Sequence, residues 1–241
     1  MRVKTLILGA CFLVACGSSP LGASTDSAAG AGSGGTPVFV DMCSAARAQL
    51  IGAVDTVSSG EVTVLSVSGG VTTLYVNATA GGSNGAVSNP WTFISLDKAS
   101  KVEVSDVSAL RSKAWDLAFK RALIYGNDGD GGPGNAGGAL LDKAFADVTR
   151  ADATGVDFVD ERFFDADCNP NVDLTGQVYT SFADWYEYDT ATHVLTPAPG
   201  TLLVRGATGK LFKLQVQTYY ATPSGGMGTA GGAYLLKLEA L

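Results

Sequence analysis

Short runs of β-branched and aromatic residues, interrupted by glycine, proline and asparagine, constrain the fold of this chain more than any other feature. Residues 62–67 and 71–76 are two such runs, and Ser68-Gly69-Gly70 between them is typical of a hairpin turn. Similar runs cover residues 92–96, 102–104, 117–124, 201–205, 210–220 and 233–238. Many short strands joined by such turns predict an all-β domain of two facing, mainly antiparallel sheets.

Helices are expected to be few and short. The best candidate runs from Met42 to about Val54, because its alanine, arginine, glutamine and leucine residues favour a helix. A second candidate covers Ala139–Val148. We therefore expect one or two short helices beside the sheets.

The N-terminus has the pattern of a secretory signal peptide. Arg2 and Lys4 precede an apolar run at residues 6–15. That run is too short for a membrane-spanning helix, which needs about 20 residues, but it suits a signal peptide. We expect residues 1–15 to be removed from the mature protein.

The signal ends in Leu13-Val14-Ala15-Cys16, which resembles the lipobox of bacterial lipoproteins. This resemblance implies that Cys16 is lipidated and that acyl chains alone hold the protein on the membrane. Gly17 stands where an inner-membrane retention signal would have Asp, so we expect an outer-membrane lipoprotein that faces the periplasm or the cell surface. The alternative is an ordinary signal peptide with a chance cysteine. Residues 16–36, rich in Gly and Ser, predict a flexible tether, and residues 37–241 the folded domain.

Composition excludes several function classes. With 16 Lys+Arg against 23 Asp+Glu, the formal charge of −7 argues against a nucleic-acid partner. A site built from several histidines is excluded, because His193 is the only histidine. An enzyme would need convergent titratable groups, and the sequence offers no such set, so we expect a protein that is not an enzyme.

Two cysteines belong to the predicted folded domain. Cys43 and Cys168 would pair in an oxidising compartment, closing a loop of about 125 residues. The alternative is two unpaired thiols, one of them buried.

Three segments in order resemble the HmuY-like proteins, a family of lipid-anchored bacterial haem-binding proteins. The first, residues 114–129, opens with Ala-Trp-Asp-Leu-Ala-Phe-Lys-Arg. The second, residues 184–193, reads Asp-Trp-Tyr-Glu-Tyr-Asp and ends in Thr-His. The third, residues 203–220, includes Gly-Lys-Leu-Phe-Lys-Leu and ends in Thr-Tyr-Tyr. The resemblance covers about residues 88–241.

The resemblance implies an all-β fold that holds haem between strands and loops and passes it, without chemistry, to an outer-membrane receptor. Family members coordinate the iron through pairs of His or Met side chains. A His–His pair is impossible here, so the candidate axial ligands are His193 and Met227, since imidazole and thioether both bind haem iron. An ordinary turn histidine and a solvent-exposed methionine are the alternatives. Beyond a possible haem iron, no metal is expected.

Other interpretations remain open. The chain could be an HmuY-like surface scaffold that binds no haem and mediates contacts with proteins or other ligands, such as another small apolar molecule. The Gly/Asp-rich residues 127–135 could offer oxygens to Ca²⁺, although Gly138 stands where an EF-hand loop would close with Glu. Acidic residues between Asp157 and Asp167 could serve a glycosidase but are more typical of a solvated loop. Aromatic residues could pack in the core or stack on a porphyrin: Trp115, Trp185, Tyr186, Tyr188, Tyr219 and Tyr220.

Overall fold

The computed structural model describes residues 43–174 and 176–241. The signal peptide, the lipidated Cys16 and the tether predicted for residues 1–36 therefore lie outside the described residues. Within the described part, none of the helices is long and apolar enough to span a membrane.

Six antiparallel strands form the larger sheet, in the order β1-β2-β12-β11-β10-β7. They are β1 (Val62–Ser68), β2 (Val71–Asn77), β7 (Gly137–Leu141), β10 (Thr201–Arg205), β11 (Leu211–Thr218) and β12 (Ala233–Ala240). The predicted hairpin is present as β1 and β2, which pair from Ser68 and Val71 outward. Gly69 and Gly70 make its turn at φ 59° and 85°, a conformation that glycine adopts without a steric penalty.

A four-stranded antiparallel sheet has the order β4-β3-β5-β6. It consists of β3 (Thr92–Ser95), β4 (Ser100–Lys101), β5 (Leu117–Lys120) and β6 (Leu123–Gly126). The single strand predicted at 117–124 is wrong: Lys120 pairs with Leu123, and Arg121 turns the chain at φ 52°. The prediction failed because this turn contains no glycine or proline to interrupt the apolar run. The strand expected at 102–104 is also wrong, since β4 lies just before it.

A third pairing joins β8 (Tyr186–Asp189) to β9 (Val194–Pro197) as a hairpin. The helices are α1 (Ser44–Leu50) and α2 (Asp106–Ala109), with 3₁₀ turns η1 (Ala86–Ser88), η2 (Phe145–Asp147), η3 (Arg150–Ala153) and η4 (Ala183–Trp185). The helix expected over 42–54 is thus shorter. The helix expected at 139–148 is wrong, because β7 pairs with β10 and its hydrogen bonds outweigh local helix propensity.

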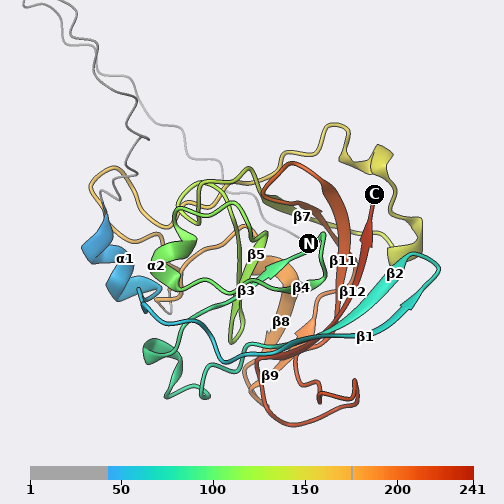
Figure 1. Cartoon of the computed structure of the whole chain (residues 1–241), viewed down its shortest axis with the longest axis horizontal. Helices are drawn as coiled ribbons and strands as arrows, with labels where there is room; N and C mark the ends of the chain where they lie inside the picture. Colours follow the sequence, from blue (N-terminus) through green and yellow to red (C-terminus); the bar gives the residue numbers. More distant parts are fainter. Residues whose placement is uncertain (1–42, 175) are drawn as a thin grey trace, which may run out of the picture. The chain divides into compact units, whose positions relative to one another are not determined.

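Side chains of these elements pack into two main hydrophobic cores, one on each face of the small sheet. In Figure 1, α1 and α2 lie on the left, the four-stranded sheet in the middle, and β11, β12 and β2 on the right. One core fills the space between the two sheets and includes Leu117 and Phe119 of β5. The other covers the opposite face of the small sheet and includes Trp115 and Ala118. The predicted fold of facing antiparallel sheets is confirmed, and Trp115 lies in a different core from Leu117 and Phe119.

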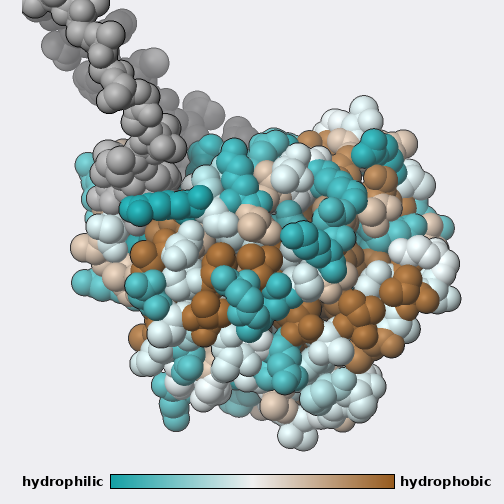
Figure 2. All heavy atoms as spheres, viewed as in Figure 1, coloured by the Kyte–Doolittle hydropathy of each residue, from teal (hydrophilic) through white to brown (hydrophobic). Residues whose placement is uncertain are grey.

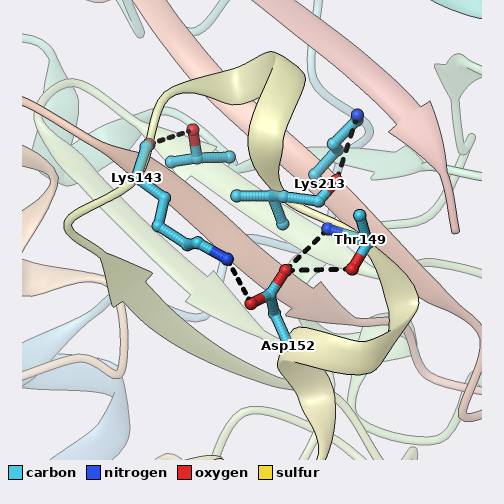
Figure 3. Close-up of polar contacts among 6 residues, drawn as sticks. Lys143, Thr149, Asp152 and Lys213 are labelled. Atoms are coloured by element: carbon cyan, nitrogen blue, oxygen red, sulfur yellow. Dashed lines mark hydrogen bonds and ion pairs between the residues drawn. The ribbon is translucent and has the colours of Figure 1, made fainter.

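Polar side chains fasten the 143–153 segment to the outer face of the large sheet (Figure 3). Buried Lys213 of β11 donates from Nζ to the Val148 carbonyl at 3.2 Å. Asp152 accepts from the Thr149 backbone N–H at 2.8 Å and pairs with Lys143 at 2.5 Å. These groups satisfy one another, so the cluster stabilises the loop and carries no sign of a ligand site.

Candidate functional site

An open cavity of about 340 Å³ lies where the end of α1, η1 and the β5–β6 turn approach one another. Leu50, Ile51, Val87, Ala122 and Leu123 give it apolar walls. Small-molecule sites are commonly apolar concavities of about 300–1,000 Å³ with a few polar groups that orient the ligand. This cavity is therefore a candidate binding site for a small molecule.

Trp91 holds the end of α1 against the small sheet. Its Nε1 donates to the Ile51 carbonyl at 2.7 Å. Lys120, the last residue of β5, places its Nζ 5.0 Å from the centre of the Trp91 ring and 3.5 Å from the same carbonyl. The indole therefore positions the cavity wall and stabilises the lysine cation.

Two consecutive cations, Lys120 and Arg121, line the cavity beside its apolar walls, as do the amides Gln49 and Gln177. Burial lowers the pKa of Lys120, and the charge of Asp106 opposes that shift. Arg121 donates from Nη1 to the Gly231 carbonyl, and its own carbonyl accepts the Tyr234 hydroxyl. Cations at the edge of an apolar space favour a ligand with a hydrophobic body and negatively charged groups.

Tyr219 follows β11 and lines the cavity from the side of the large sheet. Only 3% of it is exposed, and burial raises its pKa to about 12. Its ring centre lies 5.7 Å from that of Trp185, 5.4 Å from Tyr234 and 5.0 Å from Tyr220. Of the aromatic residues singled out by the sequence, Trp115, Trp185 and Tyr219 are thus core residues, and Tyr219 also reaches the cavity.

The two candidate axial ligands lie on other segments. His193 is exposed in the β8–β9 turn, where its Nδ1 is 2.6 Å from the Tyr188 hydroxyl. Met227 is 73% exposed in the connection between β11 and β12. These segments meet where the Leu195 N–H donates to the Tyr220 hydroxyl at 3.0 Å. Of the described residues that line the cavity, none is His, Met or Cys, so the structure does not bring His193 or Met227 into it.

Cys43 and Cys168 form a disulfide in the structure, with their Cα atoms 5.3 Å apart. The bond joins the start of α1 to the segment that contains Phe163 and Phe164. Arg47 of α1 lies over both of these rings, 5.9 and 5.7 Å from their centres. The disulfide and these contacts hold α1, whose far end forms part of the cavity wall.

The acidic stretch is mostly exposed, as expected of a solvated loop, since Asp157, Asp160, Asp165 and Asp167 are all exposed, but Glu161 is an exception. Glu161 is only 1% exposed and accepts hydrogen bonds from the Gly126 N–H at 2.8 Å and the Ser181 hydroxyl at 2.6 Å. Burial raises its pKa to about 8, and that of neighbouring Asp128 to about 6. The sequence signal for this burial is weak, because Glu161 has a charged residue on each side and only the following Phe163-Phe164 pair indicates a core.

The carboxylates of the Gly/Asp-rich loop bind backbone groups of that same stretch. Asp130 accepts the Phe163 N–H at 2.6 Å, and Asp128 accepts the Glu161 N–H at 3.2 Å. Throughout residues 43–174 and 176–241, no group of three or more His, Cys, Asp or Glu side chains is arranged to hold a metal ion. The contacts that are present give this loop a structural role.

The chain was compared with models of protein families and with solved structures. The model of the family described as HmuY protein matches residues 88–230. A solved structure from Bacteroides vulgatus ATCC 8482, named as an HmuY-like heme binding protein, is 19% identical, with 74% of this chain and 96% of that chain covered and a TM-score of 0.47. An apo HmuY analog from Tannerella forsythia is 11% identical, with 77% and 99% covered and a TM-score of 0.42. A Bacteroides fragilis NCTC 9343 structure named as a lipoprotein is 15% identical, with 74% and 94% covered and a TM-score of 0.45. No curated protein matches the chain.

Proposed function

The chain belongs to the HmuY family, and from that premise we propose that it binds haem without converting it and transfers it to a partner. The observation that carries the proposal is the apolar cavity with Lys120 and Arg121 on its wall. Haem combines a flat apolar ring with carboxylates, and this cavity offers apolar surface next to two cations. The cavity is open, which suits a carrier that must release its ligand.

Lys120 and Arg121 would pair with the carboxylates, and the apolar wall would cover part of the ring. The iron itself supplies a coordination bond to an axial ligand. His193 remains a proposed ligand, because its Nδ1 contact with Tyr188 leaves Nε2 as the free ring nitrogen. Met227 remains the other. Both would have to move with their segments to reach a ring in the cavity.

We further propose that residues 1–15 are a signal peptide, that Cys16 carries the lipid and that residues 16–36 tether the domain of residues 37–241 to the outer membrane. The sequence pattern supports this arrangement. An outer-membrane receptor is the proposed recipient of the haem. Such a carrier requires no catalytic residue.

Titration with haem and with haem dimethyl ester tests the role of the two cations, because the ester keeps the ring and the iron but has no free carboxylates. The full-length protein in detergent should bind haem at least about tenfold more tightly than the ester, because the loss of even one of the two charge-assisted pairs costs about that much. The double variant Lys120→Met, Arg121→Gln should bind both alike.

Lys213→Met is the matched control for this titration. Lys213 is also a buried lysine beside an aromatic ring, 4.8 Å from the centre of Phe145, but it lies on the outer face of the large sheet. This variant should keep the preference for haem. Equal affinity of the unaltered protein for haem and its ester would overturn the proposed site.

A surface scaffold is the second candidate function, and an exposed apolar strand favours it. Figure 2 shows hydrophobic side chains over the β1–β2 hairpin, on the right of the view. Val67 of β1 is 67% exposed and Val64 is 44% exposed on this edge strand. A protein that folds but binds no porphyrin, and that loses a protein partner on Val67→Lys, would favour this second candidate.

A further inference from the structure

Proteins hold haem iron through His, Met, Cys or Tyr side chains. Of the described residues that line the cavity, Tyr219 is the one that belongs to this group. The cavity therefore holds a potential iron ligand of a chemical class that differs from the imidazole and thioether considered so far.

Packing fixes the ring of Tyr219 at the cavity wall. A Cβ atom at Gly231 would lie 2.6 Å from Tyr219 Cε1, so glycine is required there for the ring to occupy its position. Trp185 and Tyr234 contact the ring from the core side. A ligand held this rigidly costs little conformational entropy when it binds a metal.

The hydroxyl of Tyr219 differs from those of its neighbours. The Tyr220 hydroxyl accepts the Leu195 N–H, and the Tyr234 hydroxyl donates to the Arg121 carbonyl. Among the described residues, none forms a hydrogen bond with the Tyr219 hydroxyl. This oxygen is also not one of the fully buried side-chain atoms without a partner, so part of its surface is accessible. Tyr219 is only 3% exposed, and this hydroxyl, unpaired within the described part of the chain, belongs to a residue that lines the cavity together with Arg121.

We infer, on the basis of the proposed function, that Tyr219 is an axial ligand of ferric haem in this cavity, with Arg121 offsetting the charge of its phenolate. On binding, the phenol O–H bond breaks, the Oη–iron bond forms, and the proton passes to water. His193 and Met227 then remain candidates for the opposite face of the ring.

This assignment makes the protein selective for oxidation state. A phenolate is a hard, anionic oxygen ligand, so it stabilises ferric iron more than ferrous iron, whereas thioether favours the reduced metal. Ferric haem is then bound more tightly than ferrous haem or a metal-free porphyrin with the same carboxylates.

The test compares ferric haem with metal-free protoporphyrin on the full-length protein and on Tyr219→Phe. The unaltered protein should bind ferric haem at least about tenfold more tightly than the metal-free ring, which corresponds to about 1.4 kcal/mol. It should also show the charge-transfer absorption of a ferric phenolate. Tyr219→Phe should lose both while binding metal-free protoporphyrin as before. Tyr220→Phe, which alters the adjacent hydroxyl, should keep both.

A second variant retains the phenol of Tyr219 but changes the position of its ring. Gly231→Ala should displace the Tyr219 ring and lower ferric haem affinity with little effect on the metal-free ring. An unchanged absorption spectrum and affinity in Tyr219→Phe would overturn the assignment and leave the proposed haem site intact. Failure of both porphyrins to bind the unaltered protein would overturn the proposed function as well.

Discussion

At the scale of single residues, the chain buries charges in two different ways. Lys120 faces the cavity beside an indole ring, whereas Glu161 is enclosed by backbone and hydroxyl donors. The first arrangement leaves a cation near a space that a ligand can enter. In the second arrangement, hydrogen bonds within the protein occupy the carboxylate. Glu161 therefore stabilises the fold, whereas the cation of Lys120 lies beside the cavity.

The raised pKa values of Glu161 and Asp128 predict how stability depends on pH. Burial raises these pKa values to about 8 and about 6, from ordinary values of 4.5 and 3.8. Between the ordinary and the raised values the folded state holds more protons than the unfolded state, so stability falls as pH rises from about 4 to about 8.

Urea unfolding at pH 5, 6.5 and 8 measures this dependence. Glu161→Gln cannot ionise, so its free energy of unfolding should change less over this range than that of the unaltered protein. Asp165→Asn, at an exposed carboxylate of the same stretch, is the control and should retain the slope. An identical slope in Glu161→Gln would show that Glu161 is ionised in the fold across the whole range.

At the scale of elements, the disulfide determines where α1 lies. Replacing both Cys43 and Cys168 by Ser opens a loop with a sequence separation of 125 residues. The chain-entropy model predicts a loss of about 4–5 kcal/mol in the free energy of unfolding. Haem affinity should also fall, because Leu50 and Ile51 form part of the cavity wall. Guanidinium unfolding and a haem titration measure the two effects, and a stability like that of the unaltered protein would contradict the first.

Strand β7 depends on a glycine that faces an aromatic ring. A Cβ at Gly138 would lie 2.5 Å from Phe182 Cε1. Gly138→Ala should therefore destabilise the protein by about 1–3 kcal/mol through overpacking. Phe182→Leu should reduce the cost of the alanine in a double-mutant cycle followed by thermal unfolding. Additive effects of the two substitutions would show that this contact is not the cause.

The sequence predicted elements best where the turn chemistry is explicit. Gly69 and Gly70 marked the β1–β2 turn, but Arg121 and Ala122 gave no signal for the β5–β6 turn. Tyr234 and Gly231, more than a hundred residues away, bond to Arg121 and stabilise this turn. A local pattern cannot report contacts made at that distance, so the turn between the two cationic residues and β6 was missed.

At the scale of the whole molecule, the cavity exists only in the folded chain. Its wall combines the end of α1, η1, the β5–β6 turn, Gln177 and Tyr219. These segments are far apart in sequence and share no motif. The family resemblance and the two-sheet architecture could be predicted, while the cavity and its Lys120–Arg121 pair required the tertiary structure.

Membrane attachment should depend on a single thiol. Cys16→Ala should abolish lipid incorporation and release the protein from the membrane fraction, because the proposed anchor attaches its acyl chains through that sulfur. Mass spectrometry of the N-terminal peptide and fractionation of cells measure the two effects. Cys43→Ala should leave the protein membrane-bound. Retention of Cys16→Ala in the membrane fraction would contradict the lipid anchor.

Spectroscopic titration of the full-length protein with ferric haem tests the central claim most directly. Trp91 lines the cavity, so binding there should quench tryptophan fluorescence together with a shift of the Soret band. The account predicts that both signals saturate at one haem per chain. A Soret shift that never saturates, or that saturates without quenching, would contradict haem binding in this cavity.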